Sequence, residues 1–331
     1  MKTRTLGRDG PVLSALGLGC MGMSDFYGPA DDNVSIATIH AAMEASVTLF
    51  DTGDFYGSGH NEMLLAKALG GHRDKAFIQV KFGAMRDPAG GFTGFDTRPA
   101  AIKNSIAYSL KRLKTDCIDL YMPARIDPSV PIEDVAGTIS DLIKAGHVRY
   151  FGLSEAGSAN IRRAHAVHPV TALQIEYSLA ARGIERDILP ACRELGIGVT
   201  AYGVLGRGLL SGRMAAGATY GATDFRTRSP RFQGENFAAN LRLVDKLAAI
   251  AAAKGVTAAQ LAVAWALSRG EDILPLVGAR RPESLAESLG ATEIALTPQE
   301  LAAIEAAMPA GSVAGTRYDA HGMQSLDSEK G

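Results

Sequence analysis

Two segments of the sequence carry residue types that can move a proton. Asp51 and Tyr56 lie in FDTGDFYG, at the end of a short apolar run, and Lys81 closes the next apolar run, in VKFG. Tyrosine, with a pKa of about 10, is too weak an acid for neutral pH, but a nearby lysine ammonium favours the phenolate and lowers that pKa. A buried aspartate can hold the lysine. These three residues predict a general acid–base suited to carbonyl reduction, and the hydride must come from a cofactor because no side chain supplies one.

Eight short apolar runs alternate with longer amphipathic segments along the chain. Ile36, Ile39 and Met43 share one helical face in the first of these segments, which is typical of a helix packed on a core. Eight strand-then-helix units predict a (β/α)8 barrel (TIM barrel), in which active residues gather where the strands end. The predicted strands are Ala15–Gly19, Val47–Asp51, Phe77–Lys81, Cys117–Met122, Val148–Leu153, Ala172–Tyr177, Gly198–Tyr202 and Ile273–Val277.

The main alternative is a doubly wound open sheet, which uses the same local pattern. Gly17–Gly22 spells the GxGxxG motif of a dinucleotide-binding turn. That motif requires a helix to open on its third glycine. The following residues, Met23–Asn33, contain Gly28, Pro29 and aspartates and are typical of a loop. We therefore favour the barrel.

The predicted barrel accounts for the whole chain as a single domain, residues 1–331. A short N-terminal β-hairpin from about Thr3 to Leu13 is expected to cover its base. The longest irregular stretch, Gly203–Gly234, follows the seventh strand and carries five arginines. Stretches of this length in compact domains are usually functional or disordered. Residues 311–331 form a polar C-terminal tail, which we expect to be loosely held.

Composition excludes several classes of protein. The 331 residues include 34 basic and 35 acidic side chains, so the chain lacks the positive charge of a nucleic-acid binder or a polybasic membrane protein. It has no apolar run of membrane-spanning length and no secretory signal. Three separated cysteines suit neither a disulfide framework nor a zinc site, and we expect no metal. A cytoplasmic protein acting on a small molecule is predicted, and its oligomeric state is left open.

Several further motifs, taken in order, resemble the aldo-keto reductase family over nearly the whole chain. They are FDTGDFYG with the following His60-Asn61-Glu62, VKFG, GLSE, QIEYS, AYGVLGRGLLSG and LVGARRPE. The nearest likeness is to the bacterial and plant branch related to the β subunits of voltage-gated potassium channels. The resemblance implies a (β/α)8 barrel that uses NADPH, less often NADH, to interconvert a carbonyl compound and its alcohol without a metal.

The resemblance also assigns roles to residues at matching positions. Asp51, Tyr56 and Lys81 match three of the four catalytic positions of the family. An arginine pair near the adenosine end suits a 2′-phosphate, because guanidinium groups pair bidentately with phosphate oxygens, and this favours NADPH over NADH. The residues implied to bind the coenzyme are Met21, Gly22 and Asp51; Ser154, Glu155 and Gln174 at the carboxamide; Tyr202 on the nicotinamide ring; Gly203, Leu205, Arg207, Gly208 and Arg213 at the pyrophosphate; and Gly278, Arg280, Arg281, Ser284, Glu287 and Ser288 at the adenosine.

The sequence departs from the family at the fourth catalytic position. Relatives carry a histidine before an arginine here, whereas this chain has Ala124 before Arg125. Losing one such hydrogen-bond donor can cost about 10²–10³ in rate. We expect both residues to border the substrate, and Arg125 or an ordered water to replace the missing donor. The departure also leaves open an alternative, a nicotinamide-nucleotide-binding regulatory subunit with vestigial reductase activity. Five apolar residues either line a wall for a small apolar or aromatic substrate or pack in the core: Met21, Met23, Phe55, Phe82 and Met122.

Overall fold

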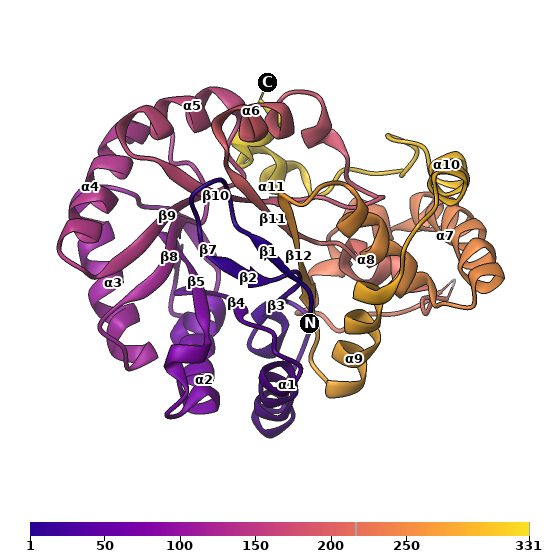
Figure 1. Cartoon of the computed structure of the whole chain (residues 1–331), viewed down its shortest axis with the longest axis horizontal. Coiled ribbons are helices and arrows are strands. Elements are labelled where there is room, and N and C mark those ends of the chain that lie inside the picture. The colour runs from indigo at the N-terminus through magenta and orange to yellow at the C-terminus, as the bar shows by residue number, and fades with distance from the viewer. Residues whose placement is uncertain (216, 331) are drawn as a thin grey trace.

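Eight parallel strands form a closed barrel at the centre of the molecule (Figure 1). The computed structural model describes residues 1–215 and 217–330. The prediction of a barrel over an open sheet is confirmed, because the first barrel strand pairs with the last as well as with its successor. The strands, in chain order, are β3 (Gly17–Gly19), β4 (Leu49–Gly53), β5 (Phe77–Phe82), β8 (Ile118–Pro123), β9 (Val148–Ser154), β10 (Val170–Glu176), β11 (Gly198–Tyr202) and β12 (Ile273–Gly278).

Helices surround the barrel because its strands are apolar on both faces. Every residue of β5 and of β8 is buried, as expected for parallel strands covered on the outside by helices. Side chains that point inward, such as Leu49, Leu120 and Leu274, form a core cluster of their own. The helices are α1 (Asp32–Glu44), α2 (His60–Leu69), α3 (Pro99–Leu113), α4 (Ile132–Lys144), α5 (Ser158–Val167), α6 (Ile188–Leu195), α7 (Gly234–Lys254), α8 (Ala258–Ser268), α9 (Pro282–Gly290), α10 (Pro298–Ala307) and α11 (Ala320–Gln324).

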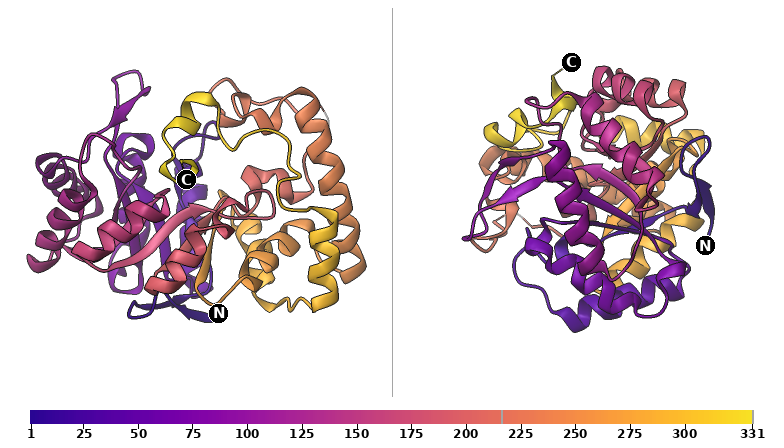
Figure 2. Two further views of the ribbon diagram at one scale, coloured as in Figure 1. Left: turned by 90° about the horizontal axis from the view of Figure 1, so that it is seen from above. Right: turned by 90° about the vertical axis from the view of Figure 1, so that its left-hand side faces the viewer.

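Each end of the barrel carries an antiparallel hairpin. The predicted N-terminal hairpin is present as β1 (Thr3–Thr5) paired with β2 (Val12–Ser14), and the adjoining Leu6 and Leu13 pack into the inner core cluster at the base. A second hairpin, β6 (Ala84–Arg86) with β7 (Phe92–Phe95), was not predicted. The left view of Figure 2 shows the N-terminal hairpin at the lower end of the barrel, and the second hairpin and the C-terminal segment at the other end.

The C-terminal tail differs from the sequence-based expectation. Rather than being loosely held, it carries α11 and packs across the end of the barrel, where Leu326 is fully buried and Arg317 is 8% exposed. The expectation failed because it rested on polarity, and the polar groups concerned find buried partners of opposite charge. The described part of Gly203–Gly234 contains short 3-10 turns, η5 (Gly206–Ser211), η6 (Phe225–Thr227) and η7 (Pro230–Phe232), without an α-helix or strand before α7.

Within residues 1–215 and 217–330, no single helix is long and apolar enough to cross a membrane. The neighbouring helices α7 and α8 meet the length and composition criteria only when taken together, and they meet at an angle of 89°.

Candidate active site

An ion pair lies between the ends of the neighbouring strands β4 and β5. Lys81 stands opposite Gly53 in the parallel register of these strands, and its Nζ donates to Asp51 Oδ1. The two side chains are only 4% and 6% exposed. The amides of Gln79 and Gln174 donate to the same carboxylate oxygen at 2.8 and 2.7 Å. Amides from β5 and β10 therefore fix Asp51, and Asp51 anchors the lysine ammonium.

The phenol of Tyr56 lies beside this ion pair. Tyr56 begins the 3-10 turn η2 (Tyr56–Gly59) and is 5% exposed, with Lys81 Nζ 5.0 Å from its ring centroid. Burial, and then the Asp51 carboxylate, raise the pKa of Tyr56 well above 10, while the Arg125 guanidinium opposes them. The expectation of a lowered pKa for Tyr56 is wrong for this structure, because burial disfavours the phenolate and the Asp51 carboxylate offsets the charge of Lys81. Tyr56 therefore keeps its proton at neutral pH.

An aromatic cluster borders Tyr56 on one side. The ring of Phe55 lies 4.7 Å from that of Tyr56, and the ring of Phe26 lies 6.1 Å from it, both edge-on. Phe92, on the unpredicted hairpin, packs against Phe26 and Phe55. These rings offer an apolar surface for a substrate. Three of the residues considered for that surface pack in the core instead: Met23, Phe82 and Met122.

The position expected for the missing histidine lies just after β8. Ala124 is 1% exposed, and its methyl group cannot donate a hydrogen bond. The neighbouring Arg125 donates from Nη1 to the Ala124 carbonyl at 2.7 Å and from Nη2 to the Tyr318 hydroxyl at 3.3 Å. Its charge reaches Tyr56 electrostatically. The structure therefore brings Arg125 to the catalytic group, together with a tyrosine from the C-terminal tail.

The strand ends on the far side of the barrel fit the nicotinamide end of a coenzyme. Ser154 Oγ is buried and has no hydrogen-bond partner in the described parts of the chain, and such groups normally find one. Gln174 directs its amide nitrogen to Asp51, which leaves its oxygen able to accept. A carboxamide would satisfy both groups. Tyr202, which is predicted to stack on the nicotinamide ring, lies at the end of β11.

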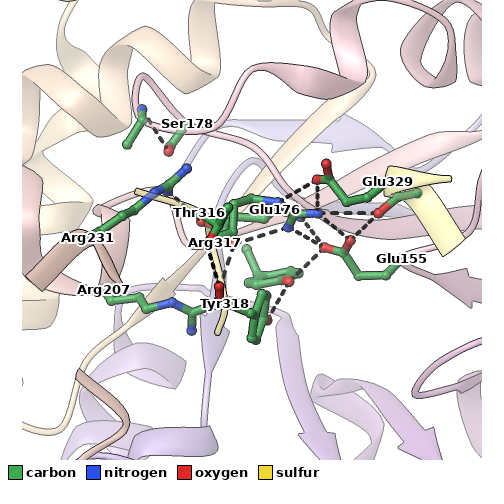
Figure 3. Close-up of polar contacts among 12 residues, drawn as sticks. Glu155, Glu176, Ser178, Arg207, Arg231, Thr316, Arg317, Tyr318 and Glu329 are labelled. Atoms are coloured by element: carbon green, nitrogen blue, oxygen red, sulfur yellow. Dashed lines mark hydrogen bonds and ion pairs between the residues drawn. The ribbon is translucent and has the colours of Figure 1, made fainter. Parts of the chain in front are cut away.

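Glu155 is contacted by residues of the C-terminal tail (Figure 3). Its backbone is in the left-handed region (φ 51°), and its carboxylate is fully buried. The oxygens accept from both Nη groups of Arg317 at 3.0 and 2.9 Å, from the hydroxyls of Tyr202 and Ser328, and from the Glu176 N–H. These contacts join Glu155 to the C-terminal tail, and its contact with the coenzyme carboxamide stays a prediction. Glu155 holds the C-terminal tail in place.

A second buried carboxylate, Glu176 at the end of β10, gathers three arginines. Arg207, Arg231 and Arg317 approach it to 3.5, 3.4 and 3.2 Å. The Arg207 guanidinium also lies 4.6 Å from the ring centroid of Tyr318. Glu176 therefore joins the C-terminal tail to the irregular segment Gly203–Gly234. We call the side chains of Glu155, Glu176, Arg207, Arg231, Arg317 and Glu329 the C-terminal charge cluster.

The other residues assigned to the coenzyme lie on segments around the same end of the barrel. Arg213 pairs with Glu287 at 2.6 Å and so joins the irregular segment to α9. Arg280 donates to two backbone carbonyls of the loop before α1, and a Cβ at Gly22 would lie 3.4 Å from its side chain. Arg281 is exposed and has no partner in the described ranges. The remaining residues lie on η1 (Met21–Met23), after β11, at the end of β12 and on α9: Met21, Gly22, Gly203, Leu205, Gly208, Gly278, Ser284 and Ser288.

The sequence of the chain matches one known protein family. The model of the Aldo/keto reductase family matches residues 15–309. The chain belongs to the aldo/keto reductase family. Nicotinamide-coenzyme-dependent carbonyl reduction, which this membership implies, agrees with the Asp51–Lys81 pair beside Tyr56.

Solved structures of other aldo/keto reductases resemble this one over most of their length. A glycerol dehydrogenase, AKR11B4, from Gluconobacter oxydans is 32% identical with a TM-score of 0.85, covering 92% of this chain and 94% of that protein. The aldo-keto reductase AKR11C1 from Bacillus halodurans is 26% identical with a TM-score of 0.79, covering 94% and 97%. An aldo/keto reductase from Klebsiella pneumoniae, in complex with NADP and acetate, is 25% identical with a TM-score of 0.74, covering 96% and 99%.

Four residues that contribute to the site were not predicted from the sequence. Gln79 lies within a predicted strand and gave no sign that its amide holds Asp51. Phe92 lies in a stretch with no predicted element. Arg317 and Tyr318 lie in the tail, and neither their spacing nor their neighbours indicate that they reach residues 162 and 116 positions earlier. Only their contacts with residues distant in the sequence reveal their contribution.

Proposed function

We propose that this aldo/keto reductase is an NADPH-dependent oxidoreductase that interconverts an aldehyde or ketone and the corresponding alcohol by hydride transfer. The observation that carries the proposal is the buried Asp51–Lys81 ion pair beside the phenol of Tyr56. A buried lysine with an aspartate partner and an adjacent phenol is an arrangement for holding and transferring one proton.

Each residue of this group has a distinct task. When bound, the coenzyme supplies the hydride. Tyr56 Oη donates the proton to the carbonyl oxygen. The Lys81 ammonium stabilises the phenolate left behind, and Asp51 keeps the ammonium in place. Ser154 and Gln174 hold the carboxamide, and Tyr202 packs on the nicotinamide ring. Ala124 and Arg125 border the substrate.

The protonation state of Tyr56 favours reduction at neutral pH. Because burial raises its pKa, the phenol carries the proton that carbonyl reduction consumes. Alcohol oxidation needs the phenolate instead. We therefore expect alcohol oxidation to increase as the pH is raised toward the pKa of Tyr56, and carbonyl reduction to decrease over the same range.

The arginines near the adenosine end support NADPH as the coenzyme. Arg281 is exposed and free to pair with a 2′-phosphate at the start of α9, and Arg280 lies beside it. A guanidinium and a helix N-terminus both favour an anion at this place. The relative from Klebsiella pneumoniae that was crystallised with NADP is consistent with this choice.

The second candidate function is a nicotinamide-nucleotide-binding regulatory subunit with vestigial reductase activity. Ala124, which stands where the family has its catalytic histidine, favours this candidate. The likeness to the branch related to potassium-channel β subunits stays a prediction. The intact Asp51, Tyr56 and Lys81 favour the enzyme.

Calorimetric titration of the purified protein with NADPH and with NADH tests the proposal. Tight binding of NADPH, weak binding of NADH and NADPH oxidation by an aldehyde would support the enzyme. Equal affinities for the two coenzymes would contradict the proposal that Arg280 and Arg281 recognise a 2′-phosphate. Tight coenzyme binding without turnover of any carbonyl class would favour the regulatory subunit. Binding of neither coenzyme would refute both candidates.

A further inference from the structure

Arg125, which is partly buried, differs from the buried cations at this end of the barrel. Lys81 pairs with Asp51, and the three arginines of the C-terminal charge cluster pair with Glu176. Arg125 forms no ion pair with any carboxylate in residues 1–215 and 217–330. Its guanidinium donates to a backbone carbonyl and to the Tyr318 hydroxyl, and its buried Nε has no partner there. The Arg125 guanidinium therefore lacks a counter-ion within the described protein.

The carboxylate that acts on Arg125 most strongly is already neutralised. Glu155 forms its bidentate pair with Arg317. Between Glu155 and Arg125 runs a chain of hydroxyl groups, in which Arg125 donates to Tyr318, Tyr318 Oη lies 2.9 Å from Tyr202 Oη, and Tyr202 donates to Glu155 at 2.7 Å. This chain holds the guanidinium in position without cancelling its charge. Tyr318, Tyr202 and Glu155 raise the pKa of Arg125 against the effect of burial, so the group stays charged.

The surroundings of Arg125 define the kind of anion it can meet. Its neighbour Ala124 leaves only a methyl group where a larger side chain would extend toward the substrate. Arg125 acts electrostatically on both Tyr56 and Lys81, so its charge is sensed at the place where the carbonyl oxygen would be protonated. Tyr56 also contacts the aromatic cluster of Phe26 and Phe55. A cation without a counter-ion and an aromatic surface, both acting on Tyr56, suit a molecule that carries a negative charge on an apolar or aromatic body.

We propose that Arg125 binds a carboxylate group of the substrate, so that the carbonyl compounds preferred by this enzyme are aldehyde or ketone acids. An uncompensated guanidinium in a protein interior is costly, and a carboxylate is the planar partner that matches it bidentately. The assignment of a substrate rests on the proposed function, whereas the anion site itself does not. Tyr318 acts here as a positioning residue, because it holds Arg125 through its hydroxyl.

The test compares each acid with its own methyl ester. The substrates are 2-, 3- and 4-formylbenzoate and phenylglyoxylate, which place the carboxylate at different distances from the carbonyl carbon. The expected result is that kcat/KM favours at least one acid over its ester by about 10- to 100-fold, as a charge-assisted pair allows. No preference for any acid in the wild-type enzyme would overturn the proposal.

Two variants identify the residue responsible. Arg125→Met is expected to abolish the acid-over-ester preference, chiefly through KM of the acid, while Arg125→Lys retains part of it. If Arg125→Met instead lowers kcat/KM for acid and ester by the same factor, Arg125 serves the carbonyl oxygen in place of the histidine, and the proposal fails. Thermal unfolding of each variant shows whether it folds. Loss of an unpaired charge is not expected to destabilise the chain.

A binding measurement separates this proposal from the proposed function. Calorimetric titration with benzoate, and with benzamide as the uncharged control, requires no turnover. Benzoate binding that is lost in Arg125→Met supports the anion site even if no carbonyl compound is reduced. Benzoate that competes with NADP⁺, or that binds the wild type and Arg125→Met equally, would refute a substrate carboxylate at Arg125.

Discussion

The active-site ion pair and the C-terminal charge cluster are both buried, but they are assembled in different ways. Lys81 and Asp51 come from neighbouring strands, 30 residues apart, and one cation meets one carboxylate. In the cluster, Arg317 crosses 162 residues of sequence to reach Glu155, and three arginines share Glu176. The first geometry follows from strand register, whereas the second depends on how a terminal segment folds back over the barrel.

The ion pair and the cluster also differ in their proposed roles. In the proposed function the Asp51–Lys81 pair responds when the neighbouring Tyr56 gains or loses a proton, and Lys81 lies beside the Tyr56 ring. The cluster reaches the site through hydroxyl groups, from Glu155 by way of Tyr202 and Tyr318 to Arg125. Substitutions in the ion pair should therefore act mainly on rate, and substitutions in the cluster mainly on stability.

The largest effect is expected at the ion pair. Lys81→Met removes the ammonium that stabilises the Tyr56 phenolate, and kcat should fall by about 10²–10⁴ in carbonyl reduction. Steady-state NADPH oxidation measures the change. Lys103→Met, on the exposed face of α3, is the matched control and should leave kcat unchanged. A fall of less than fivefold in Lys81→Met would show that the lysine does not assist Tyr56.

Arg317→Ala should weaken the fold rather than the chemistry. It leaves Glu155 without its bidentate partner, and breaking one side of a buried pair costs about 3–5 kcal/mol in the free energy of unfolding. Urea denaturation measures the loss. Arg162→Ala removes an exposed pair with Glu194 and should show no measurable change. Equal stability of Arg317→Ala and Arg162→Ala would mean that the tail is not anchored by the cluster.

Asp54 belongs to neither group, and burial shifts the pKa of its carboxyl. Burial, and then Glu62, raise the pKa of Asp54 from 3.8 to about 7, so the folded chain favours the neutral carboxyl. The contribution of the neutral Asp54 carboxyl to the free energy of unfolding is complete below pH 3.8 and is lost as the pH rises toward 7. As the pH rises from 5 to 8, the free energy of unfolding of Asp54→Asn should therefore increase by about 2 to 3 kcal/mol relative to that of the wild type. Parallel stability curves for the two proteins would contradict the raised pKa.

The smallest effect concerns the adenosine end, far from both groups. Arg281→Ala should raise the Kd for NADPH by about tenfold, the value of one charge-assisted pair at an exposed site, and leave the Kd for NADH unchanged. Calorimetry of both coenzymes measures the difference. An equal change for both would show that Arg281 does not recognise the 2′-phosphate.

The same contrast explains what could be predicted from the sequence. Asp51, Tyr56 and Lys81 follow apolar runs, and parallel barrel strands bring their ends to one face, so pattern alone brings these residues together. The eight strands were predicted for the same reason. The tail could not be placed, because Arg317 sits in a polar segment and its partners lie on β9 and β10, outside any local pattern. The pKa of Tyr56 was misjudged because neutralisation of Lys81 by Asp51 depends on geometry.

The most direct test of the central claim is single-turnover oxidation of protein-bound NADPH by 4-nitrobenzaldehyde, in the wild type and in Tyr56→Phe. Tyr108→Phe, an exposed tyrosine on α3, serves as the control. The account predicts NADPH oxidation by the wild type and by Tyr108→Phe, and a rate about 10³-fold lower in Tyr56→Phe. Equal rates in wild type and Tyr56→Phe, or no oxidation by the wild type with any aldehyde, would contradict it.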